Sequence, residues 1–297
     1  MKQNTYYRMK GKLLILILSI VTISACNNSK EAKMSDEKNE TNKSGYASIG
    51  SLKMYYEIHG SGGMPLVLIH GGGSTIETTF GNILPLFANH GKVIAVELQA
   101  HGRTSDRESA LSFEQDANDV VALLKYLEID KADFFGFSNG GHTAMQIGIS
   151  HPGVVNKLVL ASSFYKRDGV IPGFFEGIQK ASLDNMPEPL KTAYIKVAAD
   201  KNHLQVMHNK DKERMIQFKD WKDEELHSIT APTLLIIGSH DIVTPAHAVE
   251  MSHVIPHAEL MILPGDHGSY IGEICSPEKG SKIPELTVEV VEEFLKK

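Results

Sequence analysis

Continuous apolar runs recur along the chain and are separated by stretches with helical periodicity. Apolar runs of this kind are typical of sheet strands that helices cover on both faces. In residues 112–128, for example, the apolar side chains fall on one face of a helix. The alternation of strand and helix predicts a mostly parallel sheet with helices on both faces. The runs that we expect to form its strands are 65–69, 92–97, 132–135, 155–161, 231–238 and 259–263.

Two segments depart from this rhythm. Residues 52–59 alternate between apolar and polar side chains, which predicts an antiparallel strand at a sheet edge. Residues 164–227 contain no strand-like run and are rich in aromatic residues and methionine. Helical stretches within them, around 174–182, 188–200 and 212–218, predict a small helical cap over the sheet. We also expect a helix over 78–90, in spite of Pro85.

The N-terminus carries the pattern of a targeting segment. Basic residues precede the apolar stretch 13–23, which is shorter than the roughly 20 apolar residues that span a bilayer. The following Ile-Ser-Ala-Cys, residues 23–26, resembles a bacterial lipobox, which implies cleavage after Ala25 and a lipid on Cys26. The alternative is an ordinary secretory signal, with Cys26 incidental. Residues 26–45 are almost wholly polar, so we expect the lipidated cysteine and a flexible tether there.

These features predict three parts: a lipoprotein signal peptide at 1–25, the tether at 26–45 and an α/β domain at 46–297. We expect a protein of the bacterial cell envelope, anchored by its lipid with the folded domain outside the cytoplasm. Asn27 is not the aspartate associated with inner-membrane retention, which favours the outer membrane. The net charge of −6 is modest and the charges are mixed, which argues against a nucleic-acid surface.

Residues 136–141 read Gly-Phe-Ser-Asn-Gly-Gly, between a predicted strand and a predicted helix. Strand, Gly-x-Ser-x-Gly and helix in this order indicate a turn so tight that bulky side chains at Gly136 and Gly140 would collide with its flanks. Such a turn lifts the Ser138 hydroxyl to the top of the sheet, where a small molecule can reach it.

Reactive residues also follow other predicted strands. In open α/β sheets, sites lie outside the carboxyl ends of the strands. A serine hydroxyl needs a base to become a good nucleophile, and His267 suits that role. A carboxylate must hold the imidazole, and Asp241 is the candidate. The His-Gly-Gly-Gly segment, residues 70–73, lets backbone N–H groups point into a cavity.

In this order and spacing, the motifs make residues 45–297 resemble an α/β-hydrolase. The segments that carry the resemblance are 70–73, 102–105, 136–141, 238–241 and 265–267. One departure is Ala100, where many relatives have glycine. The resemblance implies the α/β-hydrolase fold and a catalytic triad of Ser138 as nucleophile, Asp241 as acid and His267 as base.

The resemblance also implies an oxyanion hole formed by the backbone N–H groups of Gly72 and Asn139. The N–H of Gly71 or Gly73 remains an alternative to that of Gly72. Such a donor typically contributes about 3 kcal/mol of transition-state stabilisation.

Other reactive residues fit the site less well. His240 lies beside the predicted acid and His142 beside the tight turn at 136–141, but neither is on the loop after the last predicted strand. No His-Glu-x-x-His motif occurs, and Pro256 interrupts the helix that would pair His253 with His257. We therefore expect no metal and no other cofactor.

The resemblance implies a serine hydrolase that cleaves a small carboxylic ester, lactone or thioester through an acyl-enzyme on Ser138. The same triad would also serve C–C bond hydrolysis, perhydrolysis or acyl transfer, which stay open. A serine, in place of an aspartate, in the tight turn at 136–141 argues against dehalogenase and epoxide hydrolase chemistry. A hydrolase fold kept as a binding lipoprotein without catalysis is the alternative from another class. The expected partners are a small acyl substrate and the membrane.

Overall fold

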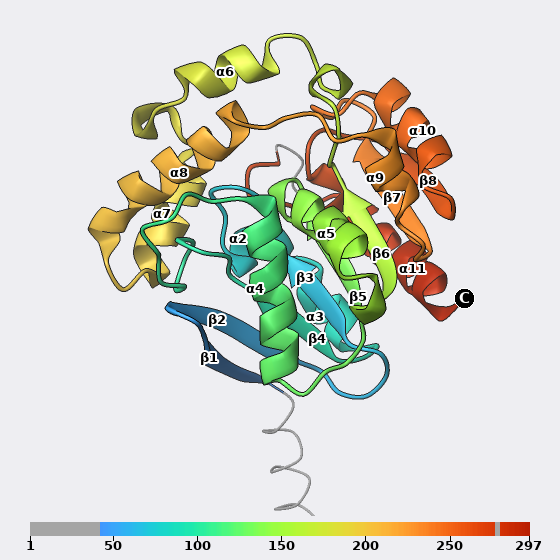
Figure 1. The fold of residues 1–297 in the computed structure, drawn as a ribbon, viewed down its shortest axis with the longest axis horizontal. Coiled ribbons are helices and arrows are strands. Elements are labelled where there is room, and N and C mark those ends of the chain that lie inside the picture. Colours follow the sequence, from blue (N-terminus) through green and yellow to red (C-terminus); the bar gives the residue numbers. More distant parts are fainter. Residues whose placement is uncertain (1–41, 277–279) are drawn as a thin grey trace, which may run out of the picture. The chain divides into compact units, whose positions relative to one another are not determined.

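The apolar runs form the centre of a sheet in the computed structural model, which describes residues 42–276 and 280–297 (Figure 1). The predicted signal peptide, Cys26 and most of the predicted tether lie outside the described residues. The described strands form one sheet in the order β1-β2-β4-β3-β5-β6-β7-β8. They are β1 (Lys43–Ile49), β2 (Leu52–His59), β3 (Leu66–Ile69), β4 (Val93–Val96), β5 (Ala132–Phe137), β6 (Val155–Ala161), β7 (Thr233–Gly238) and β8 (Ala258–Leu263).

Strand direction follows the prediction of a mostly parallel sheet. From β4 to β8, neighbouring strands run parallel, whereas β2 is antiparallel to both β1 and β4. Every residue of β3, β4, β5 and β7 is buried, as expected for strands covered on both faces. The predicted edge position of residues 52–59 is wrong, because β1 pairs outside β2. Strand β1 begins at Lys43, so the last three residues of the predicted tether belong to the sheet.

Helices cover both faces of the sheet. One face packs against α4 (Phe113–Tyr126), α5 (Asn139–Ser150) and α10 (Pro245–Val254). The other packs against α2 (Ile76–Phe80), α3 (Leu84–Ala88) and α11 (Ile283–Lys296). The single helix predicted over 78–90 is therefore two short helices. The first helix ends at Phe80, and Pro85 lies in the first turn of the second, where its missing N–H costs little.

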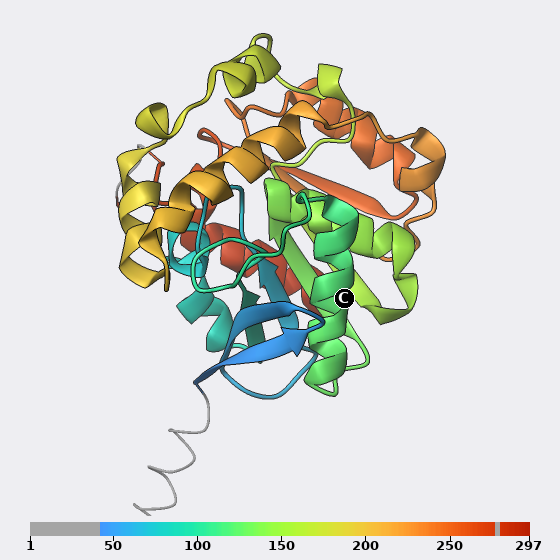
Figure 2. The same ribbon diagram turned by 60° about the vertical axis from the view of Figure 1, so that its left-hand side comes forward.

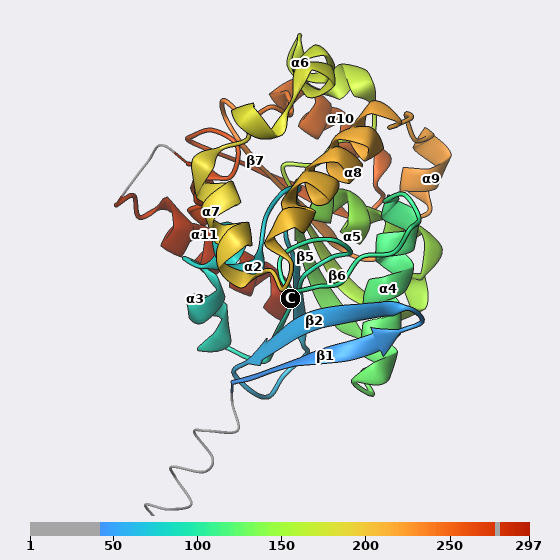
Figure 3. The ribbon, with the colours of Figure 1, turned by 90° about the vertical axis from the view of Figure 1, so that its left-hand side faces the viewer.

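The insertion between β6 and β7 is helical, as predicted. It contains α6 (Phe174–Lys180), α7 (Glu188–Val197), α8 (Leu204–Ile216) and α9 (Asp223–His227). Figures 2 and 3 show α6, α7 and α8 across one end of the sheet. Helix α8 begins eight residues before the predicted 212–218, and its first two turns mix the buried Leu204 and Met207 with polar residues.

Two apolar clusters stabilise the cap and join it to the sheet domain. Phe164 and Phe218 pack with Met215 and with Phe113 of α4, and partly buried Trp221 adds to the same group. A second cluster joins Met186, Tyr194, Leu204 and Met207 to Ala100. Within the part of the chain that the structure describes, no helix has the length and apolar character to cross a membrane.

Candidate active site

Ser138 lies in a strained turn between β5 and α5. Its backbone has φ 53° and ψ −120°, a conformation that non-glycine residues rarely adopt. The two flanking glycines are required by close contact. A Cβ at Gly136 would overlap the Gly140 carbonyl, and one at Gly140 would overlap the Ile69 carbonyl. The local geometry is that of the tight turn predicted from residues 136–141.

Asp241 and His267 are joined by a hydrogen bond. Asp241 follows β7 and His267 lies in the loop after β8, and the Nδ1 atom of the histidine is 2.7 Å from Asp241 Oδ1. The Asp241 carboxylate is buried, whereas the imidazole is 28% exposed. Burial would raise the pKa of Asp241, but the imidazole of His267 and the hydrogen bonds from Ser162 and the Gly238 N–H together hold it below its ordinary value. Asp241 is therefore ionised at neutral pH.

Ser138 and His267 line the same pocket, which has a volume of 390 Å³. No hydrogen bond joins the two side chains among the residues that the structure describes. Catalytic hydrogen bonds are often long without substrate and shorten when it binds. The fold thus brings the three predicted triad residues to one end of the sheet, where the imidazole is bonded to an ionised carboxylate and lines the same pocket as Ser138.

Residues 70–73, which we call the 70–73 loop, pass beside Ser138. The Gly71 N–H donates to Thr79 Oγ1 at 3.4 Å, and the Gly73 N–H donates to Asp211 Oδ2 at 2.6 Å. In the described part of the chain, no acceptor within the protein takes the Gly72 N–H. The geometry therefore favours Gly72 over its two neighbours as the donor to a bound ligand.

The second predicted donor is the N–H of Asn139. As the first residue of α5, Asn139 has no partner for its N–H within the helix. The backbone of Gly72 approaches the Asn139 side chain closely, since a Cβ at Gly72 would lie 2.5 Å from Asn139 Nδ2. Both residues line the 390 Å³ pocket. Only glycine fits at position 72 without displacing this asparagine.

His70 holds the start of the 70–73 loop. Its Nε2 atom accepts a hydrogen bond from the Leu98 N–H at 3.0 Å, so the proton of the neutral ring is on Nδ1. Nδ1 then donates to the Gly71 carbonyl at 2.7 Å. Burial, followed by the neighbouring His101, lowers the pKa of His70 to about 3, which keeps the ring neutral.

Ser162 was missed by the sequence analysis. It follows β6 with φ 50°, and its hydroxyl donates to Asp241 Oδ2 and lies 2.6 Å from the hydroxyl of buried Tyr270. The second oxygen of Asp241 is thus held from the β6 side of the sheet. The available signal was a hydroxyl residue at the carboxyl end of a predicted strand, next to the strand that precedes Asp241.

The rival residues lie away from the reacting groups or have other partners. His240 is exposed, and His142 is buried against the ring of Phe113 with centroids 4.8 Å apart. Burial lowers the pKa of His142 to about 3, although its Nδ1 atom is 3.0 Å from the Ser138 carbonyl oxygen. His101 Nδ1 lies 2.8 Å from the Gln99 carbonyl oxygen and contributes to fixing its loop.

The pocket beside Ser138 is mainly apolar. At 390 Å³ it lies toward the small end of the range for ligand pockets, about 300 to 1,000 Å³. Helices α6 and α8 and the segment between them supply most of the lining. Apolar lining residues include Phe164, Phe174, Ile178, Met186, Leu190 and Met207.

Known proteins are similar to this chain in sequence and in fold. The family model described as alpha/beta hydrolase fold matches residues 64–188. The chain is 27% identical to a dihydrolipoyllysine-residue acetyltransferase component of an acetoin cleaving system from Pseudomonas putida, over 72% of this chain and 61% of that protein. It is 37% identical to a 2-hydroxymuconate semialdehyde hydrolase from Pseudomonas sp. (strain CF600), over 36% of this chain and 39% of that protein. The matches thus span less than two thirds of either relative.

A solved structure covers more of the chain. The structure titled "Est816 as an N-Acyl homoserine lactone degrading enzyme" superposes with a TM-score of 0.65 and 26% identity, over 84% of this chain and 99% of that one. The family match, this superposition and the eight-stranded sheet agree on one architecture. The chain has the α/β-hydrolase fold.

Proposed function

We propose that this enzyme is a serine hydrolase that cleaves a small carboxylic ester, lactone or thioester through an acyl-enzyme on Ser138. One observation carries the proposal. The strained turn presents Ser138 to the pocket that also exposes His267, whose far ring nitrogen is bonded to buried Asp241 at 2.7 Å. A nucleophile, a base and an orienting carboxylate in this relation suit acyl transfer.

In this mechanism Asp241 accepts the Nδ1–H of His267, so Nε2 is the nitrogen that can take a proton. His267 removes the proton from Ser138 as its Oγ atom bonds to the substrate carbonyl carbon. The carbonyl oxygen becomes an oxyanion, which accepts hydrogen bonds from the N–H groups of Gly72 and Asn139. The C–O or C–S bond then breaks, and His267 returns the proton to the leaving group.

A water molecule completes the cycle. His267 takes a proton from this water, whose oxygen attacks the acyl carbon, and the second tetrahedral intermediate releases the acid and restores the Ser138 hydroxyl. The small apolar pocket favours a short or compact acyl group over a polymer. The inclusion of a lactone, expected from the sequence, is supported by the structural similarity to Est816, which is described as an N-acyl homoserine lactone degrading enzyme.

C–C bond hydrolysis with the same triad is the second candidate. It is favoured by the 37% identity to the 2-hydroxymuconate semialdehyde hydrolase. A panel of p-nitrophenyl esters, acyl lactones and vinylogous diketones would separate the two. Turnover of diketones with no ester or lactone hydrolysis would overturn the leading proposal in favour of the second.

A fluorophosphonate probe tests the nucleophile. The wild type should label covalently and Ser138→Ala should not, because the probe needs an activated serine hydroxyl. Ser239→Ala is the matched control, since Ser239 is exposed and follows β7 outside the pocket. Failure of the wild type to label would favour the reading of a non-catalytic binding protein. Equal labelling of Ser138→Ala would show that another residue reacts.

We also propose that Cys26 carries a lipid that anchors the protein in the cell envelope, with the outer membrane favoured. The lipobox-like residues 23–26 and the polar segment after them support this proposal. Labelled palmitate should enter the full chain in a bacterial host and be lost in Cys26→Ser. Cys275→Ser, which changes the other cysteine, should keep the label. Persistence of label in Cys26→Ser would refute the anchor.

A further inference from the structure

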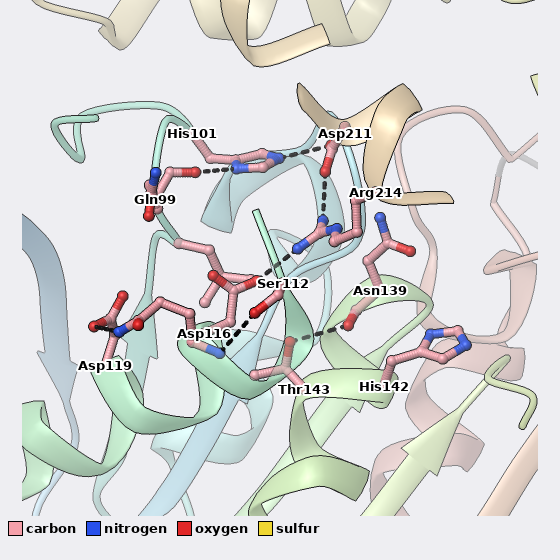
Figure 4. A network of polar contacts seen from close by, with 12 residues as sticks. Gln99, His101, Ser112, Asp116, Asp119, Asn139, His142, Thr143, Asp211 and Arg214 are labelled. Carbon is pink, nitrogen blue, oxygen red and sulfur yellow. Dashed lines mark hydrogen bonds and ion pairs between the residues drawn. The ribbon is translucent and has the colours of Figure 1, made fainter. Parts of the chain in front are cut away.

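Figure 4 shows a cluster of charged residues that joins α8 of the cap to α4 and to His101. The same cluster bonds the 70–73 loop. Asp211 of α8 accepts hydrogen bonds from the Gly73 N–H at 2.6 Å and from His101 Nε2 at 2.8 Å. One helical turn later, Arg214 bonds the other oxygen of Asp211 and also Asp116 of α4, with Nη1 to Oδ2 at 2.6 Å. We call these four side chains, His101, Asp116, Asp211 and Arg214, the charge cluster.

His101 is a cation in this arrangement. Its Nδ1 atom lies 2.8 Å from the Gln99 carbonyl and its Nε2 atom faces the Asp211 carboxylate, so both nitrogens need a proton. Burial lowers the pKa of His101, but the Asp211 carboxylate outweighs burial and raises the pKa above its ordinary value. The Gly73 N–H is also 3.3 Å from this Nε2. A protonated nitrogen accepts no hydrogen bond, so Asp211 is the acceptor for Gly73.

The charges in the cluster depend on one another. His101 and Arg214 are cations and Asp211 is an anion. Burial raises the pKa of Asp211, but His101 and Arg214 lower it well below its usual range. The side chains of His101, Asp116 and Arg214 are almost completely shielded from solvent, and that of Asp211, which lines the pocket, is 12% exposed. Removing one member would leave a charge buried without compensation, which is strongly destabilising in proteins.

His70 and the cluster member Asp211 together orient the Gly72 N–H. In a trans peptide the C=O and the N–H point in opposite directions. His70 holds the Gly71 carbonyl, so the N–H of Gly72 in the same peptide points away from His70. Asp211 holds the N–H of the next peptide, that of Gly73. The three consecutive glycines have little conformational preference of their own, so contacts with their neighbours set the loop geometry. The contacts of His70 and Asp211 are the shortest of these, beside longer ones from the Gly71 N–H to Thr79 and from the Ser74 hydroxyl to the Gly72 carbonyl.

Helix α8 is itself held against the sheet domain, so Asp211 has a defined position. Besides the Arg214–Asp116 pair, Lys210 Nζ donates to both oxygens of Asp106 at 2.8 and 2.7 Å and to the Ser109 carbonyl at 3.0 Å. These contacts lie on either side of Asp211 along the helix. The carboxylate is therefore supported from both directions.

We propose that Asp211 is a positioning residue for the oxyanion donor Gly72, and that the cap acts through it on the catalytic step. His101 and Arg214 keep Asp211 ionised and correctly oriented. The inference rests on the proposed function, because it assigns a role at the oxyanion of that reaction. The cap then has two functions: it lines the acyl pocket, and it supplies the acceptor that fixes the 70–73 loop.

Asp211→Ala, Asp211→Asn and the control Asp119→Asn test this role. Asp119 is a buried carboxylate of α4 that is paired with Arg107 and does not contact the 70–73 loop. Asp211→Ala should lower kcat on an ester about 100-fold with little change in KM, as for a donor displaced by about 1 Å. Inhibition by a trifluoromethyl ketone, which forms a tetrahedral adduct, should weaken by a similar factor.

The matched variants separate positioning from general destabilisation. Asp211→Asn keeps an oxygen for the Gly73 N–H and should recover part of kcat. Asp119→Asn should lower the melting temperature but leave kcat and ketone inhibition as in the wild type. Three results would each overturn the role of Asp211. They are a wild-type kcat in Asp211→Ala, a rise in its KM with no change in kcat, and an equal loss of kcat in Asp119→Asn.

A spectroscopic measurement tests the contact without relying on activity. Nitrogen-15 NMR of the wild type at pH 7 should show both ring nitrogens of His101 protonated and a Gly73 amide proton shifted by a strong hydrogen bond. Both signatures should be lost in Asp211→Ala. Their persistence would refute the inference even in an enzyme that hydrolyses esters. Their loss in a protein that does not label with fluorophosphonate would instead place the failure in the proposed function.

Discussion

Substitution of Ser162 tests how the fold supports Asp241. The Ser162 hydroxyl donates to one carboxylate oxygen, while His267 Nδ1 binds the other at 2.7 Å. A hydrogen bond to a charged group contributes about 1.5 to 3 kcal/mol. For a chain of this size, 1 kcal/mol corresponds to about 2 to 4 °C in melting temperature. Ser162→Ala should therefore lower the melting temperature by roughly 3 to 12 °C at pH 7.

The difference in melting temperature between the wild type and Ser162→Ala should become smaller at acidic pH. Asp241 has a lower pKa in the folded protein than its ordinary value, although burial acts the other way. Such a group stabilises the fold above its unfolded pKa, about 3.9 for aspartate, and the stabilisation is lost as pH falls through the folded pKa. The gap in melting temperature between the wild type and Ser162→Ala should therefore shrink as pH falls from 7 to below 4.

A second variant separates the hydrogen bond from backbone strain. Ser162 has φ 50°, which alanine retains at a cost and glycine adopts freely. Ser162→Gly should be about 1 kcal/mol more stable than Ser162→Ala, with the same loss of the hydroxyl. Thermal unfolding across pH measures all three proteins. Equal stability of the wild type and Ser162→Ala, or a gap that does not change with pH, would refute this account of Asp241.

Three further substitutions address the site directly. Asp241→Asn should lower kcat on a p-nitrophenyl ester about 10⁴-fold, because the amide favours the wrong imidazole tautomer; a loss below tenfold would argue against the role of Asp241. Gly72→Ala should slow fluorophosphonate labelling about 100-fold, because its Cβ would lie 2.5 Å from Asn139 Nδ2. The control Gly153→Ala should label normally, because a Cβ there has no atom within 4 Å. Ile178→Trp should narrow the pocket and reduce kcat/KM for butyrate at least tenfold more than for acetate; equal losses would place the acyl group elsewhere.

The central sheet was predictable because its strands are apolar on both faces. The outer strand β1 was not, because polar residues and glycine outnumber the apolar residues in its sequence and only Ala47 is fully buried. Pairing with β2 supplies its backbone hydrogen bonds, and the amino-acid pattern does not record that pairing. The division into α2 and α3 was also not predicted. The sequence shows Pro85, but it does not show that this proline begins a second helix.

The site divides in the same way. Ser138, Asp241 and His267 follow predicted strands, so the topology of an open sheet is enough to bring them to one end. Asp211 and Gly73 are 138 residues apart in the chain and meet only because the cap folds back over the 70–73 loop. A buried aspartate in a polar helix has the same sequence pattern as an exposed one. Ser162 required knowledge of which strands are neighbours.

The position of Asp211 has a consequence for exchanging caps between related enzymes. The cap is a continuous insertion between β6 and β7, which suggests a part that can be replaced to change substrate preference. In this protein the insertion also contains the acceptor for the Gly73 N–H and one partner of Asp116. A chimera with a foreign cap would gain a new pocket and lose the acid that holds the loop. Grafting should therefore succeed only with caps that place a carboxylate and a cation at the positions of Asp211 and Arg214.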